Sequence, residues 1–227
     1  MSPQPPTLLE SLLSVGPLLV PIAIASVVMV LCVTERLVAL RRRRVAPKRF
    51  VHCVLTQIEE GAVDRTSATK LCDENSSHIA RVFAAGLRRW GRPAVEVEQA
   101  VLDEGERTAA ELRKRLRVIS GVGNICPLLG LLGTVWGMRE AFDAIAAESA
   151  MGKPELLAGG IGSALMSTAA GLAVAIPAMI AYLHLVGRVD ALVGLVDRHG
   201  QELVNLISAE ALEERGAAKP RRAKRAA

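Results

Sequence analysis

The chain has 227 residues, of which 51% are hydrophobic, 22% charged and only 3% aromatic, and its net charge is +5. Apolar and charged residues are segregated into blocks, which excludes an ordinary soluble domain. Of the 28 Lys and Arg residues, 17 lie from Arg41 to Arg117 and eight from Arg188 onward. These basic blocks begin where apolar runs end, so the positive-inside rule explains them better than nucleic-acid binding does. We expect a membrane protein that contacts lipids and has no nucleic-acid partner.

The first apolar run predicts a transmembrane helix over residues 16–40, after a short periplasmic N-terminus at 1–15. No charge falls from Ser11 to Thr34, and Arg41–Arg44 follow the run. A cleaved signal peptide would carry its basic residues before the apolar core rather than after it. We therefore expect an uncleaved span with its N-terminus outside and the arginine block in the cytoplasm.

Residues 41–117 are predicted to form a cytoplasmic helical segment. Mixed apolar and charged stretches at 49–60 and 77–90 are broken at Gly61, at residues 73–76 and at Gly91–Pro93. After Pro93, apolar residues recur at close to helical spacing, and Gly105 alone interrupts good helix formers before Ser120. One long helix is expected to leave the cytoplasm and continue into the second span.

Two further uncharged runs predict a membrane hairpin. Residues 118–138 and 156–187 carry no Lys, Arg, Asp or Glu, and roughly 20 residues suffice to cross a bilayer. We expect transmembrane helices at 118–140 and 159–187, joined by a periplasmic loop at 141–158. A cytoplasmic helix at 188–215 and a basic, disordered tail at 216–227, resting on anionic lipid, complete the predicted order. The fold class is all-α, with three transmembrane helices and long helices extending into the cytoplasm.

Small residues form a smooth face on each hairpin helix, which favours close contact between the helices. They are three or four residues apart at Pro127, Gly130, Thr134, Gly137 and Ala141, and again at Gly160, Ala164, Thr168, Gly171 and Ala175. In one interpretation, Thr134 and Thr168 bond back to carbonyls of their own helices. In the other, they line a polar seam used by a proton or by a partner's carboxylate. His184 is the one histidine in these two runs, which contain no Asp or Glu. It lies close to the cytoplasmic end and is interpreted as an interfacial residue. The ionisable group that an ion path needs at membrane depth is therefore expected to come from a partner.

Motifs for catalysis or metal binding are lacking. The sequence has no Gly-rich phosphate loop, HExxH or GxSxG. The four cysteines show neither CxxC nor metal-ligand spacing. We expect no enzyme, no disulfide, no metal and no cofactor.

Two sequence stretches resemble the second and third spans of ExbB and TolQ proteins. The first is Pro127–Met138, PLLGLLGTVWGM, and the second covers Gly160–Ala178, with TAAGLAVAIPA at its end. Glu35-Arg36-Leu37 is similar to the end of that family's first span. Three predicted spans favour ExbB/TolQ over MotA, the four-span flagellar relative.

The resemblance implies an inner-membrane subunit of a proton-driven motor. Five copies would surround two copies of a single-span partner of the ExbD/TolR type, whose aspartate titrates, and a TonB- or TolA-like protein is a further possible partner. By matching position, Thr134 and Thr168 face the partner's aspartate on the ion pathway. The positions that shape the helices are Pro127, Gly130, Gly133, Gly137, Gly171 and Pro177. Protons are the expected coupling ion.

Two positions depart from the family pattern. Ser163, which we place on the same partner-facing ion pathway as Thr134 and Thr168, stands where ExbB and TolQ usually have a glutamate, and Leu183 stands where they have Asn. Without that glutamate the ring offers no acid of its own to the pore. This keeps an alternative open, a non-conducting membrane scaffold that retains the packing motif.

Overall fold

The computed structural model describes residues 19–147 and 154–213, and every regular element in them is an α-helix. The predicted N-terminal segment 1–15 and tail 216–227 lie outside the described residues. The helices are α2 (Leu19–Ala39), α3 (Arg42–Val45), α4 (Lys48–Glu59), α5 (Arg65–Asp73), α6 (His78–Leu87), α7 (Ala94–Lys114), α8 (Leu116–Ala147) and α9 (Pro154–Ile207). Three stretches of helix are long and apolar enough to cross a membrane: Leu19–Ala39, Ala94–Ala146 and Leu157–Ile207. The all-α fold with three candidate spans confirms the predicted class.

The chain divides into two compact units. Of the described residues, the span unit comprises 19–36, 115–147 and 154–185, and the helical unit comprises 37–114 and 186–213. α9 contributes its first part to the span unit and its last part to the helical unit.

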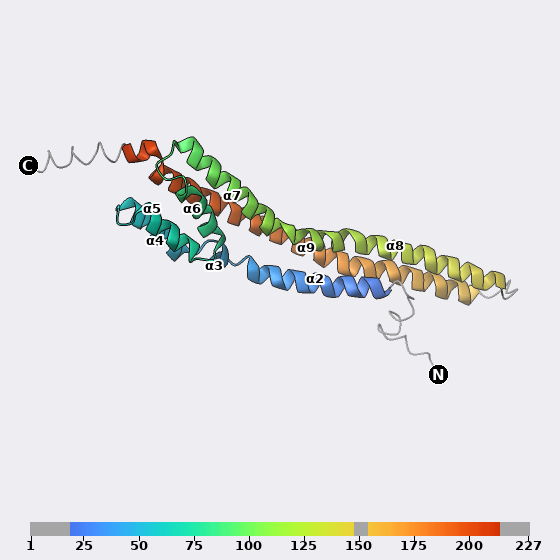
Figure 1. Cartoon of the computed structure of the whole chain (residues 1–227). Coiled ribbons are helices and arrows are strands. Elements are labelled where there is room, and N and C mark those ends of the chain that lie inside the picture. The colour runs from blue at the N-terminus through green and yellow to red at the C-terminus, as the bar shows by residue number, and fades with distance from the viewer. Residues whose placement is uncertain (1–18, 148–153, 214–227) are drawn as a thin grey trace, which may run out of the picture. The chain divides into compact units, whose positions relative to one another are not determined.

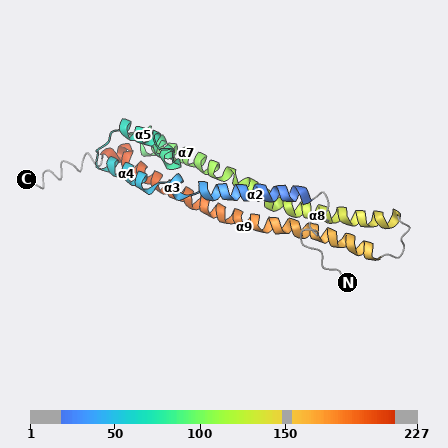
Figure 2. The same ribbon diagram turned by 90° about the horizontal axis from the view of Figure 1, so that it is seen from below.

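In the span unit, α8 and the first part of α9 run side by side as a hairpin, and α2 lies along them (Figures 1 and 2). Met29 of α2 packs in a small apolar cluster, joined by residues of both hairpin helices: Val122, Cys126, Ala175 and Ala178. At the end of α2, Glu35 forms an ion pair with Arg115. The remaining faces of these helices are covered with exposed Leu, Ile and Val side chains, as expected of surfaces that meet lipid or other membrane helices.

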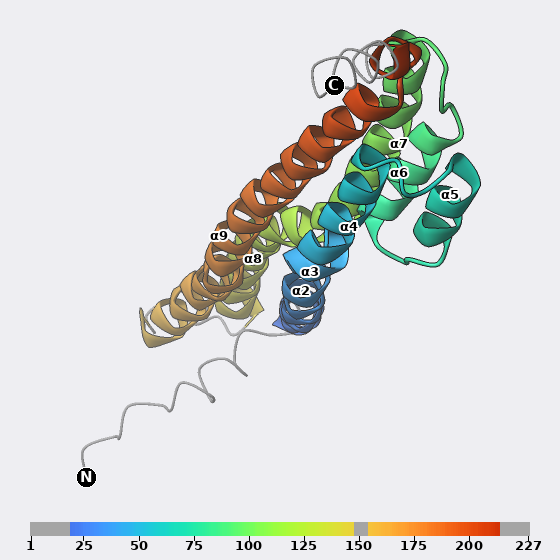
Figure 3. The same cartoon turned by 90° about the vertical axis from the view of Figure 1, so that its left-hand side faces the viewer.

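The helical unit has a conventional apolar core. α6 lies between α5 and α7 (Figure 3), and its Phe83 is fully buried and stacks on Phe50 with ring centroids 6.5 Å apart. The end of α9 closes this core, because a Cβ at Gly86 would lie only 3.1 Å from Leu203 Cδ2. Two further contacts hold that end: the Gly91 N–H donates to the Ile207 carbonyl, and the Ala94 N–H donates to the Glu210 carboxylate.

The helix boundaries differ from the predicted ones in three places. The long helix expected from Pro93 into the second span is present over Ala94–Ala146, but its regular geometry is broken at the single residue Arg115, between α7 and α8. Helix α5 had no counterpart among the predicted stretches, although Asp64 caps it by accepting from the Ser67 N–H. Helix α8 continues to Ala147 and α9 begins at Pro154, within the predicted loop 141–158. The Ala-rich residues of this stretch favour helix.

Candidate functional site: the seam between α8 and α9

The two smooth faces predicted from the sequence meet in the structure. A Cβ at Gly137 would lie 3.2 Å from Ala164 Cβ, and a Cβ at Gly130 would lie 3.0 Å from Thr168 Cα. A Cβ at Gly171 would lie 2.5 Å from the Cys126 carbonyl oxygen. The two backbones therefore approach so closely that a Cβ at Gly171 would overlap the backbone of α8, while a Cβ at Gly130 or Gly137 would require its neighbour to shift by a few tenths of an ångström.

The two predicted threonines have different hydrogen bonds. Thr168 Oγ1 of α9 donates to the carbonyl oxygen of Gly130 in α8, 3.1 Å away. Thr134 Oγ1 donates to the Leu131 carbonyl of its own helix at 2.7 Å. The interpretation that both hydroxyls bond within their own helices is thus right for Thr134 and wrong for Thr168, which links the two helices.

Two serines of α9 lie near this link. Ser163 is half-buried, and its hydroxyl donates to the Gly160 carbonyl of its own helix at 2.9 Å. Ser167 is 1% exposed, and its Oγ has no hydrogen-bond partner among the described residues. Buried hydroxyls are usually satisfied. Sequence analysis gave Ser167 no role of its own, because a serine beside a threonine on an apolar helix carries no signal of burial.

The remaining predicted positions lie on the same two helices. Pro127 lies inside α8 and Pro177 inside α9. Each proline removes one backbone donor and leaves the carbonyl four residues earlier without its usual partner. Gly133 is buried on α8. The structure thus brings Gly130, Gly137, Thr168 and Gly171 together at one seam, with the two prolines inside the same pair of helices.

Ionisable side chains are almost absent from the hairpin. Between Arg117 and Arg139, and again from Leu157 to Gly187, the one ionisable group besides cysteine and tyrosine is His184, which is exposed. Among the described residues no group of three or more His, Cys, Asp or Glu residues could hold a metal ion. The seam can therefore hold backbones together and offer hydroxyls, while strong acid–base chemistry needs a group from elsewhere.

A family model matches residues 74–198, more than half of the chain and all of the seam described above. It is the model of the MotA/TolQ/ExbB proton channel family. The chain belongs to this family. The predicted resemblance to ExbB and TolQ proteins is confirmed.

Similar proteins carry both names. The biopolymer transport protein exbB1 of Vibrio cholerae is 50% identical over 64 residues, which is 28% of each chain. The Tol-Pal system protein TolQ of Pseudomonas aeruginosa is 33% identical over 129 residues, covering 52% of this chain and 55% of TolQ. The biopolymer transport protein ExbB of Salmonella typhimurium is 32% identical over 133 residues, covering 52% and 54%. The matches thus span about half the length of these relatives or less.

Proposed function

We propose that this chain is a non-enzymatic inner-membrane subunit of a motor or channel driven by the proton-motive force. Five copies would surround a single-span partner of the ExbD/TolR type. The assembly would couple ion flow either to force on the cell envelope or to import that depends on a TonB- or TolA-like protein. The proton is the proposed coupling ion, and no cofactor is involved. The N-terminus would lie in the periplasm, with residues 41–117 and 188–215 on the cytoplasmic side.

The observation that carries this proposal is the hydroxyl link between α8 and α9, in a hairpin whose uncharged stretches contain no acid. Thr168 Oγ1 donates to the Gly130 carbonyl, and the stretches 118–138 and 157–187 contain no carboxylate. A path for protons through a membrane normally needs an ionisable residue at membrane depth. A partner span that brings one carboxylate to the Thr134 and Thr168 side of the hairpin would supply it. The match to a proton channel family agrees with a proton path in which this chain supplies the hydroxyls and a partner supplies the carboxylate.

The exposed apolar faces supply a surface for such an assembly. Leu128, Leu131 and Val135 of α8 are each more than half exposed, as are Leu165 and Ile176 of α9. Side chains of this kind suit either lipid or a neighbouring membrane helix. A ring of copies around a partner span would use some of these faces for protein contact and leave the rest to lipid.

The test is proton flux through proteoliposomes that contain this chain co-expressed with the single-span, aspartate-bearing protein encoded nearest to it. We expect flux above that of empty liposomes, and a loss of most of it with Thr168→Val. Thr34→Val is the matched control, because Thr34 is also a membrane-helix threonine and its hydroxyl donates only to carbonyls of its own helix, those of Val30 and Leu31. Flux equal to empty liposomes, in a complex that native mass spectrometry has shown to contain both proteins, would end the motor proposal.

A second candidate is a non-conducting membrane scaffold, and Ser163 is the observation that favours it. This residue replaces the glutamate common in ExbB and TolQ, and its hydroxyl is already bonded to the Gly160 carbonyl. The scaffold predicts the assembled complex without flux. Restoring the acid with Ser163→Glu distinguishes the two. In a motor this substitution would change the proton flux or its pH profile, while a scaffold would still show no proton flux.

A further inference from the structure

A cationic cavity follows the first membrane helix. It has a volume of about 710 Å³ and is lined by Arg42, Arg43, Ala46, Pro47, Lys48 and Arg49. This volume falls within the range of roughly 300–1,000 Å³ typical of small-ligand pockets. Four of its six lining residues are cations, and none is acidic. We propose that this cavity binds the phosphodiester headgroup of an anionic membrane phospholipid.

The position along the chain fits the headgroup region of a bilayer. Helix α2 is 21 residues long, about the length that crosses a bilayer, and ends at Ala39. Arg42, the first cation of the cavity, comes three residues later. Basic residues directly after a span lie at the level of the lipid phosphates, where anionic lipids attract them.

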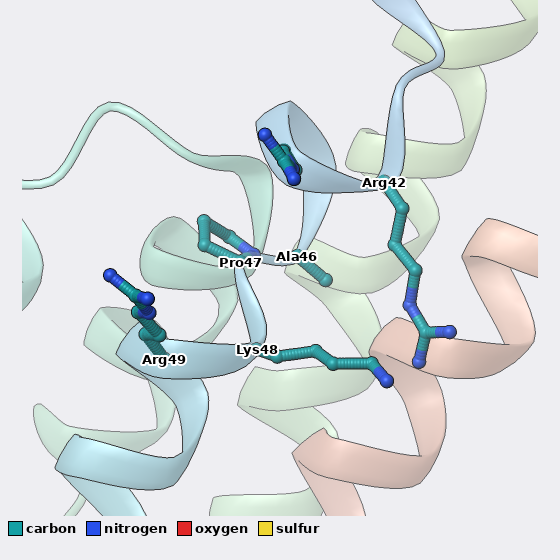
Figure 4. A pocket seen from close by; sticks show the side chains of 6 residues that line it. Arg42, Ala46, Pro47, Lys48 and Arg49 are labelled. Carbon is teal, nitrogen blue, oxygen red and sulfur yellow. The ribbon is translucent and has the colours of Figure 1, made fainter.

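The cations of the cavity have no acidic partner among the residues that the structure describes. Among the described residues, no ion pair involves Arg42, Arg43, Lys48 or Arg49. Figure 4 shows the side chains of Arg42 and Lys48 extending toward each other and toward α9, while Arg49 points to the other side of Pro47. Like charges that converge without an acidic partner repel each other, and an anion between them removes the repulsion.

The start of α4 adds a second attraction for an anion. Its N-cap is Pro47, which makes no side-chain capping bond, and its first turn contains no acidic residue. Lys48 and Arg49 stand there instead, although cations are unfavourable at the positive end of a helix. A phosphate beside them would reverse this penalty and could accept from the free backbone N–H groups of the first turn.

A second cavity, lined in part by leucines, shares Arg42 with the first and favours a lipid over a free anion. It has a volume of about 260 Å³ and is lined by Leu40, Arg42, Arg188, Ala191, Leu192 and Leu195. The Arg188 Nε donates to the Leu40 carbonyl at 3.3 Å, so this arginine is held beside the cavity. Cations next to Leu side chains match the phosphate and the apolar glycerol-ester region of one amphiphile, whereas inorganic phosphate would leave the apolar part unused.

The test measures lipid binding to the full-length chain in neutral detergent by native mass spectrometry, with phosphatidylglycerol and phosphatidylcholine as probes. We expect one phosphatidylglycerol per chain to bind at least about tenfold more tightly than phosphatidylcholine, which corresponds to about 1.4 kcal/mol. Neutralising the cavity with R42Q/R43Q/K48Q/R49Q should abolish this preference. The control variant K70Q/R88Q/R92Q/R107Q also removes three arginines and one lysine, from exposed positions of the helical unit outside both cavities, and should keep the preference.

Two further arms separate charge from structure and lipid from free anion. R42K/R43K/R49K keeps the charge and should keep most of the preference, and circular dichroism should show unchanged helicity in every variant because the four side chains are exposed. Excess inorganic phosphate should displace phosphatidylglycerol only weakly. Equal binding of the two lipids, equal loss in the cavity variant and the control variant, or full displacement by inorganic phosphate would each overturn the proposal.

Discussion

Gly171→Ala is the sharpest test of the α8–α9 seam. A Cβ at this position would lie 2.5 Å from the Cys126 carbonyl oxygen and 3.1 Å from Gly130 Cα. Both obstacles are backbone atoms of α8, so no side-chain rotation relieves the overlap. The helices must move apart by several tenths of an ångström, which also stretches the nearby bond from Thr168 Oγ1 to the Gly130 carbonyl.

The magnitude follows from two opposing effects. Overpacking of a tight interface costs about 1–3 kcal/mol, while replacing a glycine inside a helix by alanine gains up to about 1 kcal/mol. We expect Gly171→Ala to destabilise the chain by roughly 1–2 kcal/mol. Gly162→Ala is the matched control on the same helix, because a Cβ there would meet nothing within 4 Å. That variant should be neutral or slightly stabilised.

The assay is reversible unfolding of the full chain in mixed micelles, followed by helicity, with both variants measured beside the parent. The reasoning predicts a gap between the two alanine variants of at least about 1 kcal/mol, with Gly171→Ala the less stable. If Gly171→Ala matched Gly162→Ala, the close backbone approach described here would be wrong.

Three further predictions concern the helical unit. Phe83→Ala should cost about 3–5 kcal/mol in chemical unfolding, since the ring is fully buried; a loss below 1 kcal/mol would contradict this core. The Arg81 guanidinium lies 2.6 Å from Glu111 and lowers the pKa of that carboxyl. The pair should stabilise the fold by at most about 1 kcal/mol, because it is so exposed; this contribution should be present above the ordinary glutamate pKa and fade as the pH falls through the lowered pKa. Unfolding curves of the parent and Arg81→Gln from pH 7 to pH 3 check this, and a stability difference between them that stays constant over this range would refute it. Burial and, secondarily, Asp73 raise the pKa of the Cys72 thiol to about 12, so maleimide should label exposed Cys53 first at neutral pH; equal labelling rates would count against the buried position.

Several features of this protein can be predicted from the sequence because they depend on local composition. The three candidate spans follow from long stretches without charge, since an ionised side chain is costly at membrane depth. The smooth faces of α8 and α9 follow from small residues spaced three or four apart, which a helix places on one side. Gly130, Gly137 and Gly171 were predicted on this ground, and each meets the opposite helix.

Other features depend on how the helices are rotated and offset, and no single stretch encodes that. Thr134 and Thr168 occupy equivalent places in the sequence pattern, yet only the Thr168 hydroxyl reaches across, because the opposite carbonyl of Gly130 lies at its level. The burial of Ser167 has the same origin. Arg41–Arg44 predict which side of the membrane they occupy, but the turn at Ala46–Pro47 that brings Lys48 round toward Arg42 is visible only in three dimensions (Figure 4). Charge and periodicity are properties of the chain itself, whereas hydrogen-bond partners and cavities exist only once segments distant in sequence have packed together.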